Sequence, residues 1–196
     1  MVVAGSYKRT QMNNRDLDVL ILPGWGDSGP EHWQSLWLNE NPRFKRVVQS
    51  DWINTSLDEW VATLSTYVEA CSSRAVLVGH SLSSVLIPHW AQRNDASKIA
   101  GALIVAQTDV ERRATCPPET WGFAPIPRNP LPFPSIVVVG ADDPYADFKT
   151  AEDLAKSWGS ELVNIGKGGH INVASGFGPW PQGEELLQKL CERASR

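Results

Sequence analysis

The fold of this chain follows from one stretch, Val76-Leu77-Val78-Gly79-His80-Ser81-Leu82-Ser83-Ser84-Val85-Leu86-Ile87. The apolar run 75–78 has the length and the β-branched content of a buried strand, and it stops at Gly79. After Ser81 the apolar residues recur at a helical spacing. A serine at a sharp turn from strand to helix has the geometry of a nucleophile elbow, where the helix start offers backbone N–H groups. The alternative is an ordinary turn whose serine caps the helix. Ser83 stands where the pattern Gly-x-Ser-x-Gly has its second glycine.

Apolar runs of strand length alternate with helical patterns along the chain. Because the runs are continuously apolar, they predict a parallel sheet covered on both faces. The expected fold class is α/β, with an open doubly wound, mostly parallel sheet of about six strands and helices on both faces. Strands are expected near 18–22, 46–50, 75–78, 101–106, 135–140 and 161–165.

Domain organisation is predicted from composition. Residues 1–16 are expected to form a flexible arm, and residues 17–196 a single domain. Seven of the 14 prolines fall between about 110 and 134, which predicts an irregular excursion there, without a regular helix or a central strand.

Charge and cysteine usage narrow the function classes. A net charge of −4 without a basic cluster argues against nucleic acid as a partner. The absence of a long apolar run argues against a membrane span. Three widely spaced cysteines suit free thiols, so a cytoplasmic location is expected. A protein partner is not indicated, and no pair of histidines or cysteines has the spacing of metal ligands, so no metal is expected.

Two further residues follow predicted strands and complete a catalytic pattern. Asp143 comes after the fifth strand and His170 after the sixth, so Ser81, Asp143 and His170 occur in the order typical of α/β-hydrolases. A serine needs a base to take its proton, and the base needs a carboxylate to hold its tautomer. Asp142 is a rival for the acid role. Asp143 is preferred because Pro144 forces the residue before it into an extended conformation.

The reaction also needs donors for a developing oxyanion, and we expect the backbone N–H groups of Trp25 and Leu82 to supply them. Gly24-Trp25-Gly26-Asp27-Ser28-Gly29 also fits the spacing of a dinucleotide-binding loop, with Asp51 as the acidic partner, but that reading leaves the three catalytic residue types unexplained. Trp121, Phe123 and Trp180 are expected to line a substrate pocket if the excursion folds over the site.

Five short segments together resemble a known family: Leu22-Pro23-Gly24-Trp25, Gly79-His80-Ser81-Leu82, Asp142-Asp143-Pro144-Tyr145, Gly169-His170-Ile171-Asn172 and Ser175-Gly176-Phe177-Gly178-Pro179-Trp180-Pro181. The chain from about Val19 to Leu190 is similar to the small serine hydrolases of the retinoblastoma-binding protein 9 and bacterial YdeN type. The resemblance implies a compact α/β-hydrolase with a Ser-Asp-His triad and no cofactor.

The working hypothesis is therefore a serine hydrolase that cleaves a small or medium ester through an acyl-enzyme. The alternatives are an aminopeptidase or amidase acting on small peptides, and a binding protein that keeps the hydrolase fold with little activity. The expected partner is a small-molecule ester or amide.

Overall fold

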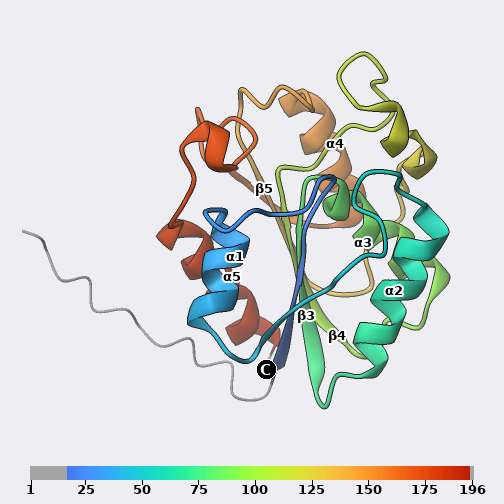
Figure 1. Ribbon diagram of the computed structural model, residues 1–196, viewed down its shortest axis with the longest axis vertical. Helices are drawn as coiled ribbons and strands as arrows, with labels where there is room; N and C mark the ends of the chain where they lie inside the picture. The colour runs from blue at the N-terminus through green and yellow to red at the C-terminus, as the bar shows by residue number, and fades with distance from the viewer. Residues whose placement is uncertain (1–16, 195–196) are drawn as a thin grey trace, which may run out of the picture.

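A computed structural model describes residues 17–194, which are built on one six-stranded sheet (Figure 1). All neighbouring strands are parallel, in the order β2-β1-β3-β4-β5-β6, so the predicted α/β fold class is confirmed. The strands are β1 (Leu17–Leu22), β2 (Phe44–Arg46), β3 (Arg74–His80), β4 (Ile99–Val105), β5 (Ser135–Val139) and β6 (Glu161–Asn164). The arm predicted at 1–16 lies outside the described residues.

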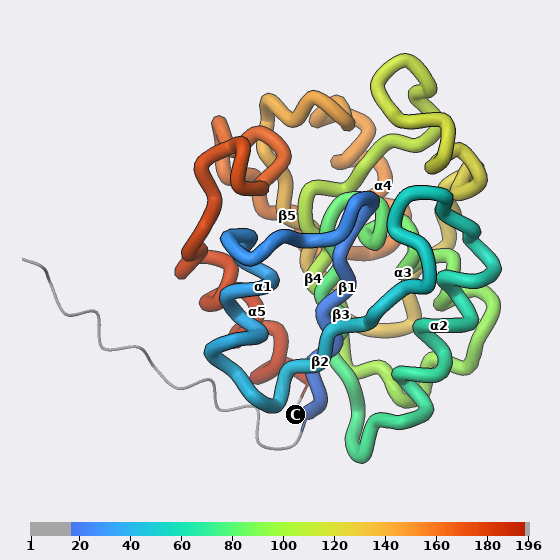
Figure 2. Tube along the Cα trace, viewed as in Figure 1, coloured from blue at the N-terminus to red at the C-terminus, as the bar shows by residue number. Residues whose placement is uncertain are grey.

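Helices cover both faces of this sheet, as the Cα trace also makes clear (Figure 2). On one face lie α1 (Trp33–Glu40) and α5 (Pro181–Ala194), and on the other lie α2 (Leu57–Glu69), α3 (Leu82–Arg93) and α4 (Phe148–Trp158). Alternate residues of each strand belong to different cores. In β1, for example, Val19 packs in the core beneath α1 and α5, whereas Leu20 packs beneath α2 and α3. Two-sided burial explains why the strands are continuously apolar.

The second strand is shorter than predicted. The sequence indicated 46–50, whereas β2 spans Phe44–Arg46. The Val47 N–H still donates to the Ile21 carbonyl, at 2.9 Å, but the Val48 N–H donates to the Tyr67 hydroxyl instead of a strand. Because β2 is an edge strand with a partner on one side only, the chain can leave the sheet after that bond although Val47 and Val48 are apolar.

The proline-rich segment between β4 and β5 contains no α-helix or strand among its described residues. Its ordered element is one short 3₁₀ helix, η1 (Pro118–Phe123). Phe123, Ile126 and Phe133 are buried against the core beneath α2, α3 and α4, so the segment is packed onto the body of the protein.

The carboxyl ends of the parallel strands meet at one edge of the sheet, and the loops that follow β1, β3, β4, β5 and β6 lie there together. Sites in open α/β sheets form at this edge. Within residues 17–194, no helix has the length and apolar character needed to cross a bilayer.

Candidate active site

The turn between β3 and α3 holds Ser81 in a strained backbone conformation. Its φ of 56° and ψ of −122° are unfavourable for a residue with a side chain, and such strain persists only where the surroundings impose it. Gly79 permits the tight turn, because a Cβ there would lie 2.8 Å from both the Ser83 carbonyl oxygen and Ile87 Cδ1. The strand and the helix therefore approach closely enough to present the Ser81 hydroxyl at the sheet edge.

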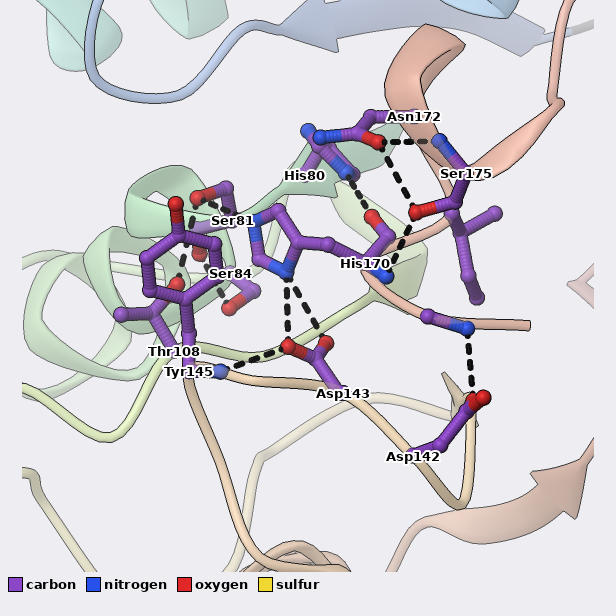
Figure 3. A network of polar contacts seen from close by, with 12 residues as sticks. His80, Ser81, Ser84, Thr108, Asp142, Asp143, Tyr145, His170, Asn172 and Ser175 are labelled. Carbon is purple, nitrogen blue, oxygen red and sulfur yellow. Dashed lines mark hydrogen bonds and ion pairs between the residues drawn. The ribbon is translucent and has the colours of Figure 1, made fainter. Parts of the chain in front are cut away.

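The His170 ring faces this hydroxyl, with 2.9 Å between His170 Nε2 and Ser81 Oγ (Figure 3). Two contacts hold the loop that carries the histidine. Its backbone N–H donates to Ser175 Oγ at 3.1 Å, and its backbone carbonyl accepts a 2.9 Å hydrogen bond from His80 Nε2. A carbonyl only accepts, so His80 must carry its proton on Nε2. His80, the residue before the nucleophile, thus fixes the position of the candidate base.

Asp143 contacts the other side of the imidazole. Its Oδ1 and Oδ2 lie 3.1 and 2.9 Å from His170 Nδ1, and its side chain is only 2% exposed. The Tyr145 N–H also donates to Asp143 Oδ1, at 2.9 Å. Because the carboxylate accepts from Nδ1, the facing Nε2 is left as an acceptor for the Ser81 hydroxyl.

Asp142 has a different role. Its Oδ1 accepts the Gly169 N–H at 2.8 Å, which joins the loop after β5 to the loop after β6 (Figure 3). Asp143, and not Asp142, is the carboxylate in contact with the imidazole.

The loop after β1 lies against the turn at Ser81. A Cβ at Gly24 would be 2.7 Å from Ser81 Cβ and 3.2 Å from the Leu82 nitrogen. Trp25 and Leu82 both line the adjoining cavity. In the described part of the chain, neither of their backbone N–H groups takes part in a turn or cap hydrogen bond. Both residues expected to supply oxyanion donors therefore line the same cavity as Ser81.

A polar cluster behind this loop restrains its shape. Arg46 forms an ion pair with Asp27, at 2.5 Å, and also donates to the Ser28 carbonyl and to Ser35 Oγ. Gln34, fully buried, donates to the carbonyl of Leu22, where β1 ends.

The cavity beside Ser81 has a volume of about 180 Å³, which is small for a ligand pocket. Its lining mixes glycine, aromatic, hydroxyl and imidazole groups and contains no lysine or arginine: Gly24, Trp25, Asp27, His32, His80, Ser81, Leu82, Thr108, Pro117, Thr120, Tyr145, His170 and Asn172. Thr108 Oγ1 lies 3.1 Å from Ser81 Oγ, and the Tyr145 ring packs on His170 with 4.5 Å between ring centroids.

The three aromatic residues predicted for this pocket lie elsewhere, so that prediction is corrected. Trp121 donates its indole N–H to the Cys116 carbonyl and has Arg113 over its ring. Phe123 is buried beside Trp60, in the core. Trp180 stacks on Trp37 beneath α1 and α5, with ring planes 8° apart. The proline-rich segment does contribute to the cavity, but through Pro117 and Thr120. The prediction failed because the sequence does not show whether an aromatic side chain packs in the core or lines a pocket.

Two further histidines that the sequence did not single out, His32 and His80, also line the cavity. Their rings are 4.8 Å apart, and His80 is 5.0 Å from His170. His32 is 6% exposed, and its Nδ1 accepts the Gln34 N–H at 3.2 Å, which caps α1. Burial, followed by the nearby charges of His170 and Arg46, lowers the pKa of His32 to about 4. Burial also lowers the pKa of His80 well below its ordinary value. No local sequence signal marks either residue, because their proximity comes from α1 packing on β3.

Among residues 17–194, no three His, Cys, Asp or Glu side chains are grouped so as to hold a metal ion.

Known proteins give an independent comparison. The profile of the family described as serine hydrolase matches residues 19–189. YdeN of Bacillus subtilis (strain 168), named as a hydrolase, is 24% identical over 192 residues, which cover 91% of this chain and 98% of YdeN. The structure of a YdeN-like hydrolase from Pectobacterium atrosepticum is 33% identical with a TM-score of 0.83, and the match covers 92% of this chain and 94% of that one. Est1E from Butyrivibrio proteoclasticus is 12% identical with a TM-score of 0.63, covering 91% and 90% of the two chains, and is alike in fold alone. The chain belongs to the serine hydrolase family, and it is a hydrolase with the α/β-hydrolase fold.

Proposed function

We propose that this enzyme hydrolyses a small, uncharged carboxylic ester through an acyl-enzyme, with Ser81 as nucleophile, His170 as general base and acid, and Asp143 as the carboxylate that orients His170. One observation carries the proposal. His170 donates a hydrogen bond to Asp143 and accepts one from Ser81, each 2.9 Å at its shortest, and Ser81 lies at a cavity that Trp25 and Leu82 also line.

Each residue then has a defined step. Ser81 Oγ forms a bond to the ester carbonyl carbon while its proton passes to His170 Nε2. The carbonyl oxygen gains negative charge, which the Trp25 and Leu82 N–H groups stabilise. His170 gives its proton to the departing alkoxide. Water then attacks the acyl group, with His170 again as the base, and Ser81 is restored.

The cavity supports a small and uncharged substrate. A volume of about 180 Å³ suits a short acyl group better than a long chain. No cationic side chain lines the cavity to bind an anionic substrate. Among the residues that line the cavity, Asp27 carries a carboxylate. Its ion pair with Arg46 reduces the ability of that carboxylate to bind an ammonium group of a substrate.

Ser81→Ala is the direct test. We expect turnover of 4-nitrophenyl acetate to fall by roughly 10⁴-fold and labelling by a fluorophosphonate probe to disappear, because no other group replaces the attacking oxygen. Ser135→Ala is a matched control, since Ser135 is a buried serine at the opposite end of the sheet, bonded to Ser160. Labelling that persists in a folded Ser81→Ala protein would exclude Ser81 as the nucleophile.

A substrate panel tests the reaction class. The wild-type enzyme should prefer 4-nitrophenyl acetate and butyrate to the octanoate, and should cleave amino-acid 4-nitroanilides far more slowly. Faster cleavage of the anilides would favour the peptidase alternative. A wild-type protein that neither turns over the esters nor reacts with the fluorophosphonate would favour a binding role.

We also propose that the enzyme works in the cytoplasm. Support comes from its three cysteines, Cys71, Cys116 and Cys191, which are buried and form no disulfide.

A further inference from the structure

Ser83 occupies the position where a nucleophile elbow usually carries glycine, and its hydroxyl has a specific partner. The residue lies in the first turn of α3 and is only 1% exposed. Ser83 Oγ donates to the backbone carbonyl of Pro23 at 2.5 Å. This bond joins two segments that are 60 residues apart: the helix that follows the nucleophile and the loop that follows β1.

The loop after β1 needs such an attachment. The strand ladder ends at Leu22, so no neighbouring strand holds Pro23 or the residues after it. Further along, the Gly26 N–H donates to the Trp52 carbonyl, and Arg46 contacts Asp27. Between these anchors and β1, the Ser83 hydroxyl supplies a hydrogen bond directly to the backbone of the loop.

The same bond connects the two segments that carry the candidate oxyanion donors. Pro23 is two residues before Trp25, and Ser83 is one residue after Leu82. The Ser83–Pro23 contact therefore links the segment with one N–H donor to the segment with the other. The lack of a Cβ at Gly24 lets the segments approach, since a Cβ there would lie 3.2 Å from the Leu82 nitrogen. Gly24 therefore allows the loop to approach α3, and the hydrogen bond from Ser83 holds the loop there.

We propose that Ser83 is a positioning residue that aligns the Trp25 N–H with the Leu82 N–H in the transition state, an inference that rests on the proposed esterase function. Alanine or glycine at this position leaves the buried Pro23 carbonyl without its donor, and the loop relaxes away from α3. A displaced donor stabilises the oxyanion less while substrate binding is largely retained, because the charge develops only in the transition state.

The test compares Ser83→Ala and Ser83→Gly with the wild-type enzyme and with Ser135→Ala, the matched loss of a buried hydroxyl. Substrate kinetics use 4-nitrophenyl acetate, and a trifluoromethyl ketone serves as the probe whose adduct carries an oxyanion. For both Ser83 variants we expect kcat to fall roughly 10- to 100-fold, with KM changed less than about threefold. Affinity for the ketone should fall in parallel with kcat. Ser83→Thr, which keeps the hydroxyl, should recover part of the lost kcat.

A purely structural role gives a different result. In that case the Ser83 variants lose thermal stability, as Ser135→Ala does, while kcat and ketone affinity of the folded protein stay at wild-type values. That outcome overturns the proposal for Ser83 and leaves the esterase function intact. Wild-type enzyme that shows no ester turnover and no fluorophosphonate labelling overturns the esterase function and, with it, the role of Ser83.

Discussion

Replacing His32 by asparagine should make the protein lose less stability in acid than the wild-type protein does. His32 is buried between α1 and β3, and its pKa in the folded protein is about 4, compared with an ordinary value of 6.5. Burial is the main cause, followed by the charges of His170 and Arg46. Between these two pH values the unfolded chain binds the proton more readily than the folded protein. The free energy of unfolding therefore decreases as the pH falls from about 6.5 towards 4.

The size of the effect follows from this difference in pKa. Linkage through one group with these two pKa values costs about 2 kcal/mol of stability by pH 5 and about 3 kcal/mol by pH 4. Asparagine at position 32 can still cap α1, since it is a favoured N-cap residue, but it does not titrate. His80 and His89, whose pKa values burial also lowers, are present in both proteins, so the part of their contributions that comes from burial cancels in the comparison.

Urea unfolding of the two proteins between pH 7.5 and pH 4.5 measures this difference directly. The histidine-to-asparagine change removes packing contacts, which lowers the free energy of unfolding by the same amount at every pH. The prediction concerns how the difference in free energy of unfolding between the two proteins changes with pH. As the pH falls, His32→Asn should become more stable relative to the wild-type protein, by about 2 kcal/mol at pH 5. A difference that stays constant over this range would refute the reasoning and would mean that His32 is more accessible to solvent than its packing indicates.

Two further substitutions address the catalytic geometry, each with a neighbour as control. Asp143→Asn should lower kcat for 4-nitrophenyl acetate by roughly 10³- to 10⁴-fold, because an amide does not stabilise the protonated base, whereas Asp142→Asn should have a much smaller effect. Similar losses in both variants would contradict the assignment of the acid. Gly24→Ala should lower kcat at least roughly 10-fold, because its Cβ would lie 2.7 Å from Ser81 Cβ and must displace the loop. Gly29→Ala, whose Cβ meets nothing within 4 Å, should leave kcat unchanged, and equal effects of the two changes would exclude this steric explanation.

The parts of the fold that depend on residues close together in the sequence could be predicted from the sequence alone. Apolar runs that end at glycine or proline marked the strands, because burial on both faces requires side chains of one kind along the whole run. The serine at the strand-to-helix turn, and the order of serine, aspartate and histidine, are also local features. Each is read at its own position, and the parallel topology then brings the loops after the strands to one edge.

Contacts between distant segments were decided by the tertiary structure. The sequence favoured Asp143 over Asp142 from its place before proline, but only the packed loops show which carboxylate contacts His170 and which contacts Gly169. The cavity wall was predicted wrongly at Trp180, because an aromatic side chain fits a core and a pocket equally well until its neighbours are known.

Ser83 illustrates the same division. From the sequence alone, it is a serine in place of a glycine at a nucleophile elbow. Its bond to the Pro23 carbonyl exists because β1 and β3 are adjacent in the sheet, which brings residues 60 positions apart into hydrogen-bonding distance. The sequence determined which side chains stand at the strand ends, since that depends on local pattern. The tertiary structure decided which of them touch, since contact depends on how separate elements pack.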